Sequence, residues 1–386
     1  MISTATTPSV RAPGRWRPAA AGSPTRGRAA SLRASLVASL LAALLAALLA
    51  PLLTGCAGPA LRADPAPAPR LERFRVPTMG TVLEVAVPAG PRAELAARVV
   101  FDTFAEVDQR MSEWRPDSPL TRVNEAAGGA ATAVPAEVLA LVRRGLELGD
   151  LTGGAFDITW AALWGLWDFQ AETPEVPDPQ EIATRVARVD YRRVEVDLAA
   201  RTLRLPDKGM ALGTGGIAKG WALDLAAQRL RDAGVSDYLV SGGGQVLAAG
   251  RSGAAPWLVG LRDPRGLPTD SFATLALAPK PGEALSVSTS GDYEHFFEAG
   301  GVRYHHILDP RTGMPARGLR AATVVAADAT LADALSTALF VMGTDAGLAL
   351  VARLPGVEAV LVDDAGRVHT SAGLTDALTV LHPPAP

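Results

Sequence analysis

An apolar run near the N-terminus constrains this chain most, because it separates a segment that cannot join a soluble core from the part that can fold as a globular domain. Residues Leu36 to Leu53 are almost entirely leucine and alanine, and the first 33 residues contain six arginines and no acidic residue. A basic stretch followed by an apolar run is typical of an export signal. The globular fold is therefore expected in residues 71–386, outside the cytoplasm.

The apolar run ends in Leu53-Thr54-Gly55-Cys56, and Cys56 is the only cysteine of the chain. This ending resembles the lipobox of bacterial lipoproteins, whose cysteine is acylated and becomes the mature N-terminus. The resemblance implies a signal peptide over residues 1–55 and a lipid on Cys56 that holds the protein on the periplasmic side of the inner or outer membrane. Ala57 carries no inner-membrane retention signal, which favours the outer membrane. Two alternatives stay open: Leu36 to Leu53 persists as a membrane-spanning helix, or Cys56 is an inert buried thiol.

Residues 56–70 are rich in alanine and proline, a composition that favours an extended tether between the lipid and the domain. A single cysteine leaves no internal disulfide. The formal charge of -3 includes the six signal-peptide arginines, so the mature chain has a charge of -3 - 6 = -9. An acidic body without a basic cluster argues against a nucleic-acid partner.

The order of helical and strand-like segments after residue 70 predicts an α+β fold. Strand patterns cover 71–87, a hairpin at 193–196 and 202–205, and several short strands within 238–308. Helical spacing covers 92–111, 134–150, 219–234, 330–342 and 345–354. Residues 168–180 are polar and proline-rich and are expected to form a surface loop. Strands grouped in the middle and helices grouped toward the ends favour α+β over alternating βαβ units.

A glycine-rich turn, Gly213-Thr214-Gly215-Gly216, opens the helix that contains Lys219. Glycines let backbone N–H groups approach a ligand, and the start of a helix favours negative charge, so the turn suits a phosphate or pyrophosphate. Plain helix capping is the common alternative for such a turn. Lys219, one of three lysines in the chain, favours the phosphate interpretation.

A second pair of residues, Asp333 and Thr337, is spaced four apart in an apolar helix and therefore lies on one helical face. A carboxylate and a hydroxyl together suit a hard cation such as Mg2+. A helix-capping aspartate with a threonine that bonds to its own backbone is the alternative.

Histidines and aromatic residues form two further groups. His306 stands beside the tight turn Asp309-Pro310, and since His305 and His306 are adjacent on a strand, only one of them can enter a given site. Trp114 and Phe156 could stack on a planar ring, although core packing is the default for any aromatic residue.

The order of these motifs along the chain resembles the ApbE family of FAD:protein FMN transferases. The matching segments are Met79-Gly80-Thr81, Met111 to Asn124, Gly154-Ala155-Phe156-Asp157, Gly215 to Gly220, Thr289 to Tyr293, His306 to Gly313 and Asp333 to Thr337. The resemblance covers nearly all of residues 71–354 and implies T-fold-related mixed sheets with flanking helices. It also implies that FAD is bound and attacked in the presence of Mg2+. FMN then passes to a Ser or Thr hydroxyl of an exported acceptor, either a membrane redox subunit or a small flavin carrier, and AMP leaves.

Matched by position, the resemblance assigns the site residues of this chain. The flavin contacts are Met79, Trp114, Ala155, Phe156, Asp157, Gly213, Lys219 and Ile307. The metal contacts are Gly216 through its carbonyl, Asp333, Ser336 and Thr337. His306 is expected to accept the proton of the acceptor hydroxyl, because a near-neutral pKa suits a base at physiological pH. Asp292 or Asp309 could orient that hydroxyl instead.

Two positions depart from the family's usual pattern. Gly213 stands where an aspartate is common before the glycine-rich turn, and Gly243-Gly244-Gln245 stands where Gly-Gly-Asp is common. The loss of these acids predicts weaker Mg2+ binding or a lower catalytic rate. It also leaves open a non-catalytic FAD-binding lipoprotein. An Mg2+-dependent FAD pyrophosphatase that releases FMN and AMP is a further alternative, because the same site would serve both reactions.

Overall fold

The computed structural model describes residues 70–385, and the predicted signal peptide, the apolar run and Cys56 lie outside this range. Its helices are α2 (Ala93–Met111), α3 (Pro119–Glu125), α4 (Ala136–Thr152), α5 (Pro179–Val186), α6 (Ala218–Asp232), α7 (Ala329–Met342) and α8 (Thr344–Val351). Its strands are β1 (Leu71–Thr78), β2 (Thr81–Pro88), β3 (Thr132–Ala133), β4 (Glu195–Asp197), β5 (Thr202–Arg204), β6 (Tyr238–Gly242), β7 (Gln245–Ala249), β8 (Trp257–Arg262), β9 (Ser271–Leu277), β10 (Ala284–Gly291), β11 (Phe296–Ala299), β12 (Val302–His305), β13 (Leu319–Ala326), β14 (Glu358–Asp363), β15 (Val368–Thr370) and β16 (Leu378–Val380).

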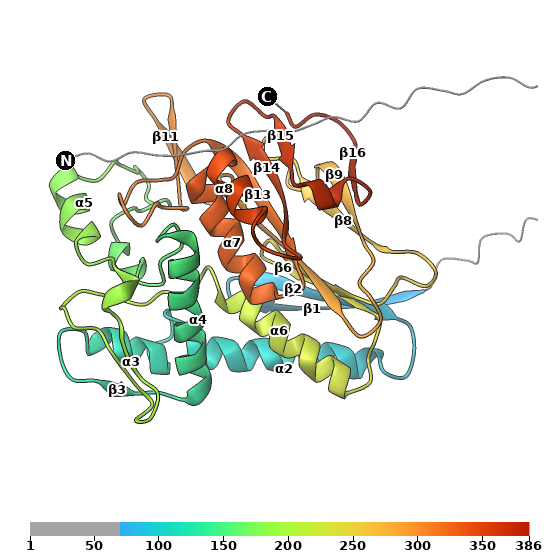
Figure 1. Cartoon of the computed structure of the whole chain (residues 1–386), viewed down its shortest axis with the longest axis horizontal. Helices are drawn as coiled ribbons and strands as arrows, with labels where there is room; N and C mark the ends of the chain where they lie inside the picture. The colour runs from blue at the N-terminus through green and yellow to red at the C-terminus, as the bar shows by residue number, and fades with distance from the viewer. Residues whose placement is uncertain (1–69, 386) are drawn as a thin grey trace, which may run out of the picture. The chain divides into compact units, whose positions relative to one another are not determined.

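An eight-stranded antiparallel sheet organises the domain, in the order β1-β2-β6-β7-β10-β13-β14-β15. Helices α6 and α7 lie beside each other, with α7 packed on β10 and β13 and with α2 packed on α6 (Figure 1). The three strands β16-β9-β8 form a small sheet that packs on the large one, and the two share a second apolar cluster. The predicted α+β class is confirmed.

Alternation along β10 explains how this sheet supplies a polar site. Val287 belongs to the apolar cluster shared with Trp257 and Phe272 of the small sheet. Ser288, one residue further, donates a hydrogen bond to Ser336 of α7 on the opposite side. Because successive side chains of a strand point to opposite faces, the serines of β10 are aimed at the helix that carries Asp333.

The boundaries of the elements differ from the sequence expectations in three places. The strand expected over residues 71–87 is the hairpin β1–β2, whose two turn residues, Met79 and Gly80, have φ values of 46° and 72°. Two positive φ values match the twist of a tight two-residue hairpin turn. Because the turn is so short, the alternation of apolar and polar residues in the sequence shows no break there. The hairpin expected at 193–196 and 202–205 forms as β4 and β5, and it gains β3 as a third strand. The expected loop ends at Asp178, whose side chain caps α5.

A third, small apolar cluster joins the hairpin β11–β12 to the segment after α4. Phe297 of β11 contacts Trp167 and Phe169, and the Trp167 indole N–H donates to the carbonyl oxygen of Gly313 at 2.8 Å. The cluster therefore fixes a hairpin whose two ends carry His295 and His306. Within residues 70–385, no helix is long and apolar enough to span a bilayer.

Candidate active site

A cavity of about 670 Å³ lies where α6, α7, β10, the hairpin β1–β2 and the segment after α4 meet. This volume is in the usual range for a site that holds a cofactor-sized ligand. The predicted site residues that line it are Met79, Trp114, Ala155, Phe156, Asp157, Gly216, Lys219, His306, Ile307, Asp333 and Thr337. Residues from six distant parts of the sequence are therefore brought to one cavity.

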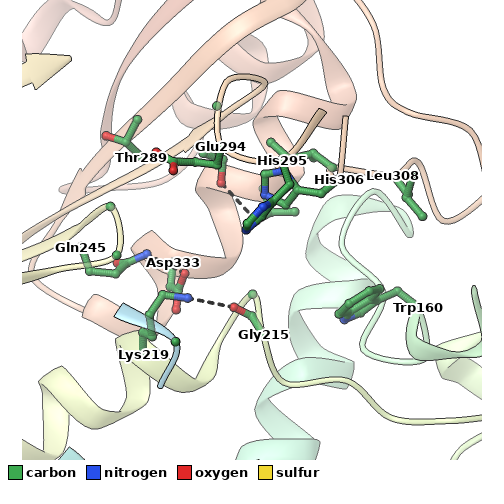
Figure 2. Close-up of a pocket in the computed structure, with 18 of the residues that line it drawn as sticks. Trp160, Gly215, Lys219, Gln245, Thr289, Glu294, His295, His306, Leu308 and Asp333 are labelled. Carbon is green, nitrogen blue, oxygen red and sulfur yellow. Dashed lines mark hydrogen bonds between the residues drawn. The ribbon is translucent and has the colours of Figure 1, made fainter. Parts of the chain in front are cut away.

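The glycine-rich turn forms one wall of this cavity and leads into α6. The ammonium group of Lys219 donates to the carbonyl oxygen of Gly215 at 3.0 Å (Figure 2). Gly220 lets α6 approach α7, because a Cβ at this position would lie 2.3 Å from the carbonyl oxygen of Ala329. This close approach brings the Gly220 N–H within 2.9 Å of the Asp333 carboxylate. The turn and the start of α6 thus place the ammonium group of Lys219 near the carboxylate of Asp333.

Asp333 is the buried carboxylate of the cavity, with 3% of its surface exposed. One carboxylate oxygen accepts from Gly220 N–H, and the other accepts from the Gln245 side-chain amide at 2.7 Å. Burial raises the pKa of Asp333, and the charge of Lys219 together with these two donors opposes that rise. A bound cation would offset the same cost of desolvation, because it favours the ionised carboxylate.

A network of hydroxyl groups behind Asp333 orients Thr337. Ser336 donates its single proton to the carbonyl oxygen of Asp333, and it accepts from Ser288 at 3.0 Å. Since a hydroxyl has only one proton, the 2.9 Å contact between Ser290 and Ser336 must use the proton of Ser290. By the same count, Thr337 donates to Ser290 at 3.2 Å. The lone pairs of the Thr337 oxygen are therefore free to face the cavity.

The donor set fits a divalent cation that also receives oxygens from a ligand. Asp333, Thr337 and the backbone of Gly216 line the cavity, and a Cβ on Gly216 would lie 3.6 Å from the Thr337 hydroxyl oxygen. Across residues 70–385, no three His, Cys, Asp or Glu side chains gather closely enough to hold a metal by themselves. Mg2+ often takes one carboxylate and completes its shell with waters and substrate phosphates.

His306 lines the same cavity as Lys219, and its ring stands edge to face against the ring of His295 (Figure 2). The ring centroids are 5.4 Å apart. Burial, aided by the neighbouring His295, lowers the pKa of His306 to about 4. Its Nδ1 atom is buried and has no hydrogen-bond partner among the residues that the structure describes. His306 is therefore neutral at physiological pH, but with this lowered pKa its ring is a weaker base than the near-neutral histidine that the sequence analysis expected.

Two tryptophans, Trp114 and Trp160, form an aromatic part of the cavity lining. Trp114 is 69% exposed, and one face of its ring stacks on Trp164 with centroids 4.4 Å apart. Trp160 stands edge-on to Trp164 and also lines the cavity. Stacking on Trp164 fixes the Trp114 ring and leaves its other face for a planar ligand.

Asp157 and Met79 have constrained positions at the cavity edge. The carboxylate of Asp157 accepts from the backbone N–H and hydroxyl of Thr159 and from the backbone N–H of Tyr191. Both of its oxygens are therefore hydrogen-bonded within the protein. Burial raises the pKa of Asp157. Met79 has a positive φ, a conformation that side chains other than glycine adopt mainly where the surrounding structure holds them.

Four predicted site residues do not line the cavity. Asp292 forms a two-fold ion pair with Arg265, with both distances 2.7 Å, and Asp309 pairs with Arg311 of its own turn. Ser336 has all three hydrogen-bonding positions of its hydroxyl filled within the protein. Gly213 lies against Trp160, whose indole N–H donates to its carbonyl at 3.1 Å. The roles assigned to these four remain predictions, and the geometry gives Ser336 a supporting place rather than a direct one.

Glu113 supplies a carboxylate at the turn where the sequence indicated that one was lost. A side chain on Gly213 is blocked, because its Cβ would lie 2.7 Å from the Trp160 indole nitrogen. The carboxylate of the buried Glu113 instead accepts from the Gly215 N–H at 3.0 Å and lies 2.6 Å from the Thr214 hydroxyl, whose proton has the Met111 carbonyl oxygen, at 2.7 Å, as its other acceptor. Glu113 belongs to a motif that the sequence analysis quoted, but only the fold shows that it reaches residue 214.

Replacing Glu113 by alanine is expected to lower the free energy of unfolding by about 2 kcal/mol, the usual range for a lost hydrogen bond to a charged group, because the Gly215 N–H then has no acceptor. Urea unfolding measures the change, with the exposed Glu125→Ala as the control. An unfolding curve identical to that of the wild type would show that the carboxylate does not hold the turn.

Several cavity residues carried no assignment from the sequence. Trp160, Gln245, Thr289, Ser290 and His295 all line the cavity. Trp160 lies three residues after Asp157, the last residue of a predicted motif, so its aromatic character was a usable signal. The others depend on strand pairing and on the β11–β12 hairpin, which the local sequence does not reveal.

Comparison with known proteins gives one consistent relationship. The sequence model of the ApbE family matches residues 79–361. The FAD:protein FMN transferase of Treponema pallidum is 37% identical over 321 residues, which cover 78% of this chain and 87% of that protein. The enzyme of the same name from Vibrio cholerae is 31% identical, covering 78% of this chain and 91% of its own length. The crystal structure of the ApbE protein of Thermotoga maritima superposes with a TM-score of 0.70 at 34% identity, and the match covers 79% of this chain and 98% of that one.

Proposed function

The chain belongs to the ApbE family, and we propose that it is an Mg2+-dependent FAD:protein FMN transferase that attaches FMN to a Ser or Thr hydroxyl of an exported protein. The observation that carries the proposal is one cavity lined by a buried carboxylate and a threonine hydroxyl, a lysine beside a helix start and a buried histidine with a lowered pKa. Phosphoryl transfer depends on positioning and on charge neutralisation more than on covalent chemistry, and these groups provide both.

Each end of the cavity has a distinct task in this reaction. Asp333, Thr337 and the Gly216 carbonyl would hold the cation, and Lys219 would lie against the pyrophosphate. When bound, Mg2+ would neutralise charge on the phosphate oxygens and make the phosphorus more electrophilic. Trp114 and Phe156 offer aromatic surface to the flavin ring.

In this reaction His306 would take the proton of the acceptor hydroxyl, and cleavage of the pyrophosphate would release AMP as the leaving group. The acceptor hydroxyl oxygen attacks the phosphorus of the FMN half of FAD, and its proton passes to the neutral ring of His306. The bond between that phosphorus and the bridging oxygen breaks, so AMP leaves with the electron pair. A new phosphoester bond joins FMN to the acceptor.

The acceptor belongs on the periplasmic side, where a membrane redox subunit or a small flavin carrier would meet the enzyme. The test mixes residues 71–386 with FAD, Mg2+ and a candidate acceptor domain, and follows AMP, free FMN and acceptor mass. A mass gain on the acceptor equal to FMN that requires Mg2+ supports the transferase. AMP and free FMN without labelling would show the pyrophosphatase, and intact bound FAD would show a carrier.

We also propose that a lipid on Cys56 holds the enzyme to the membrane, the outer membrane rather than the inner. The support is the sequence, a basic segment and an apolar run that end at this cysteine. Cys56→Ser is expected to move the protein from the membrane fraction to the soluble fraction, because one acyl-modified residue would be lost. Fractionation with immunoblotting measures this, and a variant that stays in the membrane fraction would assign the anchor to Leu36–Leu53.

A further inference from the structure

Gln245 is the buried amide beside the cation end of the cavity. It lies at the start of β7 and is 5% exposed, and its side chain points toward Asp333 (Figure 2). Its Nε2 donates to Asp333 at 2.7 Å and to Ser288 at 2.7 Å. Its Oε1 is buried and accepts no hydrogen bond from residues 70–385. A buried acceptor left without a donor costs about 1–3 kcal/mol, so the position suits contact with a ligand or with its water shell.

We propose that Gln245 makes the binding of the divalent cation depend on bound FAD, an inference that rests on the proposed function of the same cavity. The Gln245 amide is uncharged, whereas a carboxylate at this position would add a negative charge. Its N–H group also donates to Asp333, and this hydrogen bond competes with a cation for the same oxygen. The protein alone therefore attracts a cation weakly. The phosphate oxygens of FAD complete the site.

The other acids that line the cavity do not replace the missing charge. The Asp157 carboxylate is held by Thr159 and Tyr191, and the Glu294 carboxylate pairs with Arg262 at 2.9 Å. Lys219, which carries a positive charge, lies close enough to influence Asp333. Among the described residues that line the cavity, Asp333 is thus the acid at the cation end, and its two oxygens already accept hydrogen bonds from Gly220 and Gln245 beside Lys219.

Coupling of this kind is reciprocal, which makes it measurable from both sides. FAD is expected to tighten Mn2+ binding to the wild-type protein on the order of 10- to 100-fold, a usual size for coupling between two ligands. Mn2+ must then tighten FAD binding by the same factor. The free Mn2+ signal in electron paramagnetic resonance and the quenching of flavin fluorescence measure the two affinities, and AMP release followed in the same samples separates binding from turnover.

Gln245→Glu tests the residue itself. The added carboxylate is expected to tighten Mn2+ binding to the FAD-free protein by about tenfold and to reduce the coupling by the same factor. Gln245→Met, which removes the amide without adding charge, should keep the requirement for FAD. Gln109→Glu adds the same charge on an exposed part of α2 and serves as the matched control with unchanged coupling.

Two results would overturn the inference: wild-type protein that binds Mn2+ equally well with and without FAD, or Gln245→Met that loses the coupling as Gln245→Glu does. The wild-type and Gln245→Met measurements decide the matter even if Gln245→Glu fails to fold, which circular dichroism would show. Coupled binding without acceptor labelling would overturn the proposed function alone. Labelling with uncoupled binding would overturn only the role of Gln245.

Discussion

Asp333→Ala is expected to lower Mg2+-dependent FMN transfer on the order of 10³-fold, while FAD binding is weakened but still detectable. Asp333 supplies the carboxylate at that end of the cavity as the structure describes it, and its loss leaves Thr337 and a backbone carbonyl. A metal ion contributes several kcal/mol of charge stabilisation, and each 1.36 kcal/mol corresponds to about tenfold in rate. The measurement is acceptor labelling by mass, with FAD affinity from fluorescence quenching.

The control for this variant is Asp345→Ala, which removes an exposed acid from the first turn of α8. Its transfer rate should equal that of the wild type. Thermal unfolding of both variants excludes a general loss of structure. If Asp333→Ala kept the wild-type rate at saturating FAD, Asp333 would have no place in the cation site.

His306→Asn is expected to lower acceptor labelling by about 10²- to 10⁴-fold, the usual contribution of a general base, with little change in FAD or Mn2+ affinity. The asparagine retains a polar side chain of similar shape but cannot take up a proton. Because burial lowers the pKa of His306 to about 4, the ring is neutral through the physiological range. The wild-type rate should therefore show no titration near 6.5, the ordinary pKa of histidine, and should fall only as pH approaches 4.

The sign of this pH effect is fixed by the direction of the pKa change. A lowered pKa keeps the proton-accepting form present at lower pH, so activity between about pH 5 and 8 is not limited by this ring. Rate profiles for the wild type and for His382→Asn, a variant of an exposed histidine, should coincide. A wild-type rate that halves near pH 6.5 would contradict the buried, neutral state of His306.

The main elements were predictable because their signals are local. Helical spacing placed α2, α4, α6 and α7 within a few residues, and the glycine-rich turn before Lys219 was recognised from composition alone. The hairpin β1–β2 was predicted as one strand, since its turn residues, Met79 and Gly80, do not interrupt the alternation. The local sequence pattern therefore predicted whether a segment is a helix or a strand better than it predicted where the element begins and ends.

The candidate site was only partly accessible from the sequence. Ten residues transferred from the family line the cavity, as does His306, because motifs that bind a shared ligand keep their chemical type. Asp292 was different: its partner Arg265 lies on a loop 27 residues earlier, and no local pattern shows that the pair exists. Glu113 was quoted within a motif without a role, because its contact with Thr214 joins positions 101 residues apart.

The sequence by itself determined the class of fold, the ApbE family and the chemical types at the site, because periodicity, glycine placement and motif order are properties of short segments. The tertiary structure decided which of these groups meet. Packing of Trp160 on Gly213 excludes an acid there, and Glu113 provides one from another helix end. Burial then gave Asp333 and His306 their opposite pKa changes, since the cost of a buried charge depends on neighbours that only the folded chain brings together.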